Sequence, residues 1–103
     1  MKDNRKEATE DNYEAHRLVW RGKQIEVDYQ PSSFAGTAHL KIRAKHGQPL
    51  PITETGFRSH FTSPADVDHL GGPVAYVEAW LNAMAETKAW KRAERDGVQL
   101  ALF

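Results

Sequence analysis

The chain lacks cysteine, and its 103 residues carry equal numbers of basic and acidic side chains, 14 of each. Without cysteine it has no disulfide bond, no thiolate metal ligand and no cysteine nucleophile. No apolar run approaches the roughly 20 residues that span a membrane, and the charged start lacks the apolar segment of a secretion signal. We therefore expect a soluble cytoplasmic protein with no membrane partner.

The chain also lacks the dense positive charge of a dedicated nucleic-acid binder, because its net charge is zero. The charge is unevenly placed, with a mildly basic stretch over residues 17–62 and an acidic one over residues 63–86. Residues 1–15 are polar and acidic and show no apolar period. We predict that they form a disordered leader.

Apolar and polar residues alternate in three successive stretches, which is the pattern of strands with one buried face. The first two, residues 17–20 and 24–29, are separated by Arg21-Gly22, a two-residue signal for a hairpin turn. The third, residues 37–44, alternates most regularly. These stretches predict the first three strands of an antiparallel sheet.

A fourth strand is predicted over residues 52–62, with a break at Gly56. Glycine inside a strand favours a bulge or a close backbone approach. Beyond the break, Phe57 and Phe61 share one face, which we expect to be the core face. Phe34 is expected to anchor the loop that follows the second strand.

Helical signals begin at Ser63, a preferred N-cap residue, and Gly71 closes the short helix that follows. A longer amphipathic helix carries apolar residues as far as Trp90 and is predicted to end at Gly97. Strands that precede helices predict an α+β fold, in which an antiparallel meander of about four strands packs on its helices through one face. The predicted domain spans residues 16–97.

Residues 98–103 are predicted to be a C-terminal binding peptide. The sequence QLALF resembles the sliding-clamp-binding motif of bacterial replication and repair proteins, a glutamine, a leucine, a small or acidic residue, a leucine and a phenylalanine. Ala101 departs from the commoner serine or aspartate, but it is small. The residues that match the clamp-binding motif are Gln99, Leu100, Leu102 and Phe103.

In proteins with that motif, the glutamine amide bonds at the rim of a cleft on the clamp, and the leucine and phenylalanine fill it. The resemblance implies a small non-enzymatic adaptor or modulator. Its partner would be the bacterial DNA sliding clamp, and its process DNA replication or repair. A free chain end suits this role because it can lie in a groove without unfolding the domain.

The body of the chain resembles a family of small bacterial proteins of unassigned function. The resemblance rests on residues 55–61, TGFRSHF, and residues 71–81, GGPVAYVEAWL, and covers about residues 17–103. Some members of that family also end in a clamp-like peptide. The resemblance implies no activity for the folded body.

Two alternatives stay open. Basic residues on the third and fourth predicted strands would form a nucleic-acid-binding face on the open side of the sheet, although an ordinary solvated face is the simpler interpretation. Otherwise the chain is a structural or oligomerising domain whose apolar tail completes its own core or a dimer. The residues of the candidate nucleic-acid face are His39, Lys41, Arg43, Arg58 and His60.

The residues predict no catalytic or metal-binding constellation. The 5 histidines lack the close paired spacing of a zinc site. Ser59 and His60 are neighbours in a predicted strand, so their side chains point to opposite faces and form no nucleophile–base pair. We expect a chain that is not an enzyme and that holds no cofactor.

Overall fold

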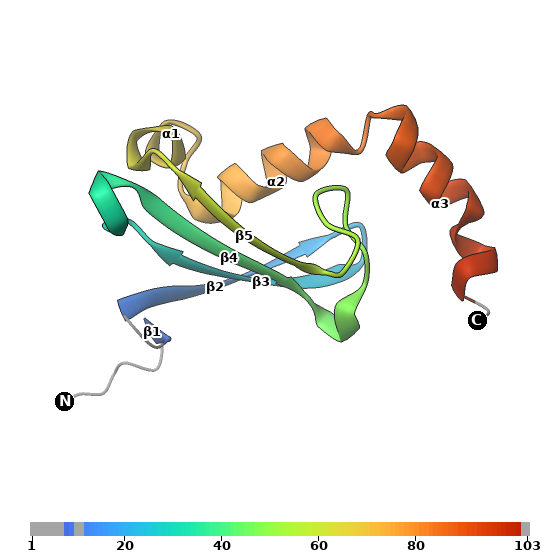
Figure 1. Cartoon of the computed structure of the whole chain (residues 1–103), viewed down its shortest axis with the longest axis horizontal. Helices are drawn as coiled ribbons and strands as arrows, with labels where there is room; N and C mark the ends of the chain where they lie inside the picture. Colours follow the sequence, from blue (N-terminus) through green and yellow to red (C-terminus); the bar gives the residue numbers. More distant parts are fainter. Residues whose placement is uncertain (1–7, 10–11, 102–103) are drawn as a thin grey trace.

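The computed structural model describes residues 8–9 and 12–101, and the side chains of residues 12–96. Figure 1 shows an antiparallel sheet with helices along one side, in the strand order β1-β2-β3-β4-β5. The α+β meander predicted from the sequence is confirmed. The strands are β1 (Ala8–Thr9), β2 (Tyr13–Trp20), β3 (Lys23–Gln30), β4 (Ala38–Ala44) and β5 (Phe57–Thr62). The helices are α1 (Pro64–His69), α2 (Pro73–Met84) and α3 (Lys88–Ala101), and the short 3-10 turns are η3 (Phe34–Gly36) and η4 (Lys45–Gly47).

The β2–β3 hairpin has the predicted turn at Arg21-Gly22. Both residues have positive φ, 50° and 79°, as the favoured two-residue hairpin turn requires. The start of β2 differs from the prediction, because this strand begins at Tyr13 and pairs with the two residues of β1. Tyr13 is 6% exposed, so part of the stretch predicted as a leader belongs to the folded sheet.

The core lies between the sheet and the helices on its covered side. Val27, Leu40 and Ile42 of the central strands are fully buried. Val77 and Leu81 of α2 are fully buried in the same cluster. Each such side chain stabilises the fold by about 1.5–3 kcal/mol relative to an exposed one. The predicted packing of an amphipathic helix on one face of the sheet is therefore confirmed.

The long C-terminal helix predicted from the apolar stripe is divided into α2 and α3. The hydroxyl of Thr87 donates to the carbonyl oxygen of Met84 at 2.8 Å and accepts from the amide of Trp90 at 3.2 Å. Threonine is a preferred N-cap, so Thr87 ends one helix and begins the next. Within the described chain, neither helix is long and apolar enough to cross a membrane.

The last helix, α3, turns away from α2 and extends past the end of the sheet (Figure 1). Trp90 fixes its start, since its ring centroid lies 6.3 Å from that of Trp20 in the core. The helix runs through Gly97 to Ala101, so the predicted helix end at Gly97 is wrong. A glycine in a helix interior costs about 1 kcal/mol relative to alanine and does not by itself end the helix.

The two phenylalanines of β5 face away from the helices, which corrects the expectation that they face the core. Phe57 is 44% exposed and Phe61 is 55% exposed. Phe57 lies opposite Arg43 and Phe61 lies opposite His39, and opposite residues of antiparallel strands share a face. The register of β5 on β4 therefore places both rings on the uncovered side of the sheet.

The side chain of Phe34 is also exposed to solvent. It belongs to η3, which lies in the connection between β3 and β4, beyond the end of the sheet (Figure 1). Its side chain is 83% exposed. The expectation that Phe34 anchors this loop is wrong.

The loop of residues 52–56 comes close to η4 at Gly56, and a substitution at Gly56 tests this backbone contact. A β-carbon at Gly56 would lie 2.7 Å from the carbonyl carbon of Gly47 and 2.9 Å from the backbone oxygen of Gln48. Gly22 has a similar positive φ, but a β-carbon there meets nothing within 4 Å. We expect Gly22→Ala to cost about 1–2 kcal/mol for its backbone conformation. Gly56→Ala should cost about 2–5 kcal/mol, because steric overlap is added.

Urea unfolding of both variants measures the two costs directly. Equal losses of unfolding free energy would contradict the backbone contact at Gly56.

Candidate functional site

The helices cover one side of the sheet and leave the other uncovered, and we call the uncovered side the open face. Strand pairing places charged, polar and aromatic side chains together there. The residues of the open face used below are Tyr13 and Arg17 of β2, Glu26 and Asp28 of β3, His39, Lys41 and Arg43 of β4, and Phe57, Ser59 and Phe61 of β5.

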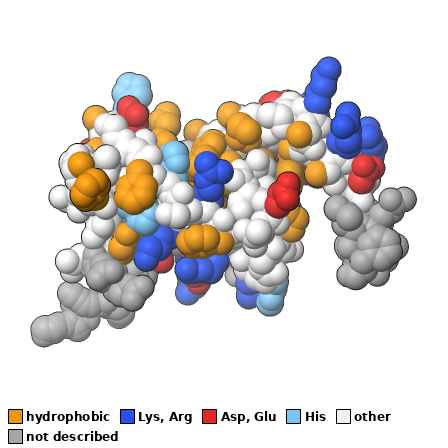
Figure 2. Space-filling model, viewed as in Figure 1, with side chains coloured by type: hydrophobic (Ala, Val, Ile, Leu, Met, Phe, Trp, Pro, Cys, Tyr) orange, Lys and Arg blue, Asp and Glu red, His pale blue; other side chains and the backbone are white. Residues whose placement is uncertain are grey.

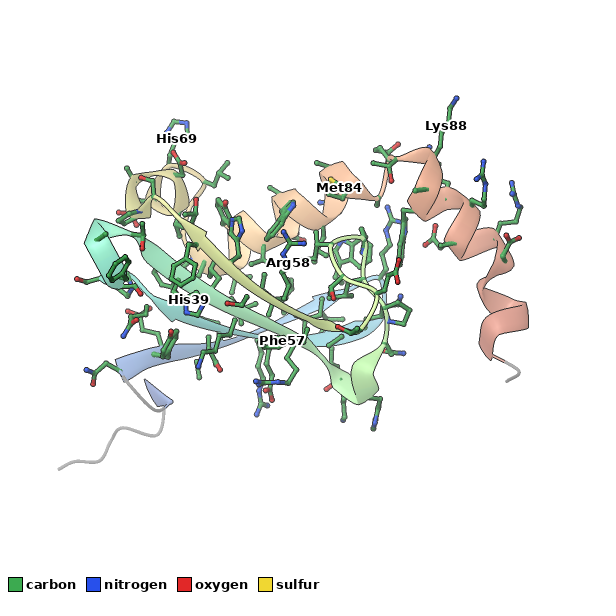
Figure 3. All side chains as sticks on the ribbon, viewed as in Figure 1. His39, Phe57, Arg58, His69, Met84 and Lys88 are labelled. Carbon is green, nitrogen blue, oxygen red and sulfur yellow. The ribbon has the colours of Figure 1, made fainter. Side chains whose placement is uncertain are left out.

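The structure divides the predicted basic residues between the two sides of the sheet. Arg58 and His60 lie opposite buried apolar residues of β4, on the covered side. In Figure 3 Arg58 points toward α2 and Phe57 points away from it. The predicted residues that remain together on the open face are His39, Lys41 and Arg43.

Aromatic side chains of α2 explain why polar residues occupy the covered side of β5. Arg58 donates to the backbone oxygen of Ile52 at 3.0 Å, and its guanidinium lies 5.3 Å from the centre of the Trp80 ring. The imidazole of His60 bonds the hydroxyl of Tyr76 at 3.1 Å, and its ring centroid lies 4.3 Å from that of Trp80. Burial lowers the pKa of His60, and the Arg58 charge lowers it further. These contacts give both residues a role within the fold.

A chain of hydrogen bonds crosses the open face. The hydroxyl of Tyr13 bonds Nδ1 of His39, and Nε2 of His39 bonds Oγ of Ser59 at 2.6 Å. The chain joins β2, β4 and β5, and His39 is only 7% exposed. Sequence reasoning missed it, because the partners are 26 and 20 residues apart and meet only through strand pairing.

The direction of these bonds decides what His39 can do chemically. Burial, together with the nearby Lys41 charge, lowers the pKa of His39, which favours the neutral ring with one donor and one acceptor. A phenol is more acidic than an aliphatic alcohol, so we assign Tyr13 as the donor to Nδ1. Nε2 then carries the proton and donates to Ser59. In this arrangement His39 accepts no proton from Ser59, so Ser59 and His39 do not form a nucleophile–base pair.

The aromatic rings of the open face lie against cationic side chains or the imidazole of His39. The rings of His39 and Phe61 stack with centroids 4.2 Å apart. The guanidinium of Arg43 lies 5.6 Å from the centre of the Phe57 ring, and the ammonium of Lys41 lies 4.3 Å from that of Tyr13. Two of these rings therefore lie next to cationic groups, and the third stacks on the imidazole of His39.

Two carboxylates reduce the positive charge of the open face. Glu26 forms an exposed ion pair with Arg43 at 3.5 Å. Asp28 is 8% exposed, and burial raises its pKa, although Arg43 and Lys41 act in the opposite direction. Asp28 is thus less readily ionised than an exposed aspartate.

A groove of about 600 Å³ lies at one end of the open face, beside the β2–β3 hairpin and η4. Arg17, Arg43 and Lys45 contribute cationic groups to its lining, and Phe57 contributes an aromatic ring. Glu26 is the acidic residue in this lining. The groove is therefore suited to an anionic ligand that also has an apolar or aromatic part.

A second groove, of about 1120 Å³, lies between residues 49–54 and α3. Its apolar lining includes Ile52, Met84 and Trp90. Among the described side chains, none that follows Trp90 in the sequence belongs to the core.

The predicted clamp-binding residues fall at the limit of the described structure. The backbone of Gln99 and Leu100 belongs to α3, while Leu102 and Phe103 lie outside the described residues. Figure 2 shows Lys and Arg side chains gathered on the part of α3 that precedes the peptide. Over the part of the chain that the structure describes, no three acidic or histidine side chains lie close enough to hold a metal ion.

The fold and the open face together define a class, a small α+β domain whose antiparallel sheet is covered by helices on one side only. The chain belongs to the family described as the KlcB third domain, whose model matches residues 13–90. The match begins with β2 and ends at Trp90, so it covers strands β2 to β5 and the core but neither β1 nor most of α3. Comparisons with curated proteins and with solved structures give no significant match.

The neutral state of His39 predicts a dependence of stability on pH. In the unfolded chain a histidine takes up a proton near pH 6.5, whereas the lowered pKa leaves His39 less protonated in the folded protein at that pH. Below about pH 6.5 the unfolded state therefore binds more protons, and the free energy of unfolding falls as the pH falls. His39→Gln should remove part of the loss between about pH 7.5 and pH 5.5, as measured by urea unfolding.

The matched control is His69→Gln, since His69 is exposed on α1. It should keep the full loss of stability. The contributions of Asp28 and His60 remain in both variants and cancel in the comparison. Identical pH profiles for the two variants would contradict the role assigned to His39.

Proposed function

We propose that this chain is a small adaptor that binds the bacterial DNA sliding clamp through Gln99, Leu100, Leu102 and Phe103. The proposal rests on one observation, which is that the family match and the core of the described side chains both end before the clamp-like peptide begins. The family match ends at residue 90, and the core of the described side chains ends at Trp90 as well. A binding peptide can be appended there without changing the packing of the domain.

The position of α3 supports this proposal. The helix extends past the sheet (Figure 1) and carries the backbone of Gln99 and Leu100 at its end. Helix ends open at little cost in free energy, and Gly97 lowers that cost further because glycine weakens a helix interior. The last turn can therefore unwind and let the peptide bind in an extended form.

The peptide should bind with a dissociation constant of about one micromolar, equivalent to about −8 kcal/mol. We expect Leu102→Ala with Phe103→Ala to abolish binding to a purified bacterial sliding clamp, because both apolar side chains that fill the cleft are removed. Calorimetric titration measures the binding. The thermal midpoint of the double variant should equal that of the unchanged chain.

Arg92→Ala with Arg95→Ala is a matched control, since both residues are exposed on α3 outside the peptide. This variant should bind the clamp with an affinity close to that of the unchanged chain. Full clamp binding by the Leu102→Ala, Phe103→Ala chain would contradict the proposal.

A structural role for the tail is the second candidate, and the apolar groove beside α3 favours it. Ile52, Met84 and Trp90 would bind an apolar segment of this chain or of a second copy. In that case, truncation after Asp96 would lower the thermal midpoint or change the oligomeric state. The adaptor proposal predicts that truncation changes neither.

A further inference from the structure

Two phenylalanine rings on the open face are exposed in positions that the core does not require. Phe57 and Phe61 leave 44% and 55% of their surface in solvent, although burying such a side chain stabilises a fold by about 1.5–3 kcal/mol. Both rings are oriented by neighbours, Phe61 by the stacked ring of His39 and Phe57 by the guanidinium of Arg43. They are therefore exposed and held in place at the same time.

The spacing of the two rings suits a linear ligand. They stand on one face of one strand, four residues apart, which is roughly 13 Å at the usual rise of a strand. Ser59, between them, is a small residue whose hydroxyl bonds His39. No bulky side chain of β5 stands between the rings on this face, so a chain with aromatic groups can contact both.

Cations lie beside the Phe57 ring. Arg17, Arg43 and Lys45 line the groove of about 600 Å³ into which Phe57 also faces, and Glu26 is the acid that opposes them. Lys41 lies farther along the face, between the two phenylalanines in the register of β4 on β5. The open face therefore offers positive charge next to exposed aromatic surface.

We propose that the open face binds single-stranded nucleic acid, with bases stacked on Phe57 and Phe61 and phosphates bound by Arg17, Arg43 and Lys45. Exposed rings on a sheet stack unpaired bases, and basic residues beside them neutralise the backbone. Duplexes fit less well, because their bases are already stacked and do not offer a free face to the rings. This surface is independent of the clamp-binding peptide.

The test measures fluorescence anisotropy of labelled 15-mers of thymidylate, of uridylate and of a DNA duplex against the full chain. The single strands should bind more tightly than the duplex. Phe57→Ala and Phe61→Ala should each weaken single-strand binding by about five- to 150-fold, the range measured when one stacking ring is removed. Preference between the thymidylate and uridylate strands shows whether DNA or RNA is the ligand.

Phe34→Ala is the matched control, because Phe34 is 83% exposed but lies in η3, outside the open face. It should leave the affinity unchanged. All three residues are exposed, so the variants should fold, and their thermal midpoints check this. An equal loss of affinity in all three variants would overturn the proposal.

A second pair of variants, equal to each other in net charge, tests the cations of the open face. Arg17→Gln with Lys45→Gln should weaken binding and reduce its salt dependence. When three phosphates are neutralised, the affinity falls roughly tenfold to twentyfold between 50 and 200 mM salt. Lys88→Gln with Arg92→Gln removes the same charge from α3, where Lys88 points away from the body (Figure 3). This control should bind almost as well as the unchanged chain.

Three further results would overturn the inference. The first is the absence of single-strand binding up to about 100 µM protein, where even non-specific binding is detectable. The second is duplex binding that is as strong as single-strand binding and that is unchanged by Phe57→Ala and by Phe61→Ala. The third is a dimer that Phe57→Ala or Phe61→Ala dissociates, as measured by sedimentation, because a second copy would then cover the face. The Leu102→Ala, Phe103→Ala chain should bind single strands normally, which separates this inference from the clamp proposal.

Discussion

The packing of α2 on the centre of the sheet determines which side of every strand is buried. Val77 and Leu81 of α2 share one cluster with Val27, Leu40 and Ile42, and all five are fully buried. Side chains alternate along a strand, so the same contact that buries one set of residues leaves the next set on the open face. The candidate site is therefore a consequence of covering the sheet on one side only.

The two sides of β5 show how this constraint distributes chemistry. On the covered side, Arg58 and His60 are paired with the carbonyl, hydroxyl and ring groups that surround them, so polar residues are tolerated next to the core. On the open side, Phe57 and Phe61 remain in solvent beside basic residues. A side chain's polarity therefore does not indicate its location in this strand. The apolar residues that ordinarily define a buried face here define a surface suited to binding.

Much of the fold could be predicted from local pattern. The alternation along β2, β3 and β4, the Arg21-Gly22 turn and the N-cap at Ser63 are each encoded within a few residues, and each appears as expected. The division between α2 and α3 was partly readable, because Thr87 is a preferred N-cap. The face of β5 was not readable, because it depends on the register with β4 and on the aromatic side chains of α2. For the same reason the Tyr13–His39–Ser59 chain gave no signal in the sequence.

By itself, the sequence determined that this chain forms a meander of strands followed by helices, and that its last residues match a peptide motif. Periodicity and caps act over one or two turns of chain, so they are visible without a structure. Only the tertiary structure decided that His39, Lys41 and Arg43 share a surface with Phe57 and Phe61, while Arg58 and His60 do not. The physical reason is that strand pairing joins residues about 20 positions apart. A shift of one residue in that pairing would have exchanged the two faces.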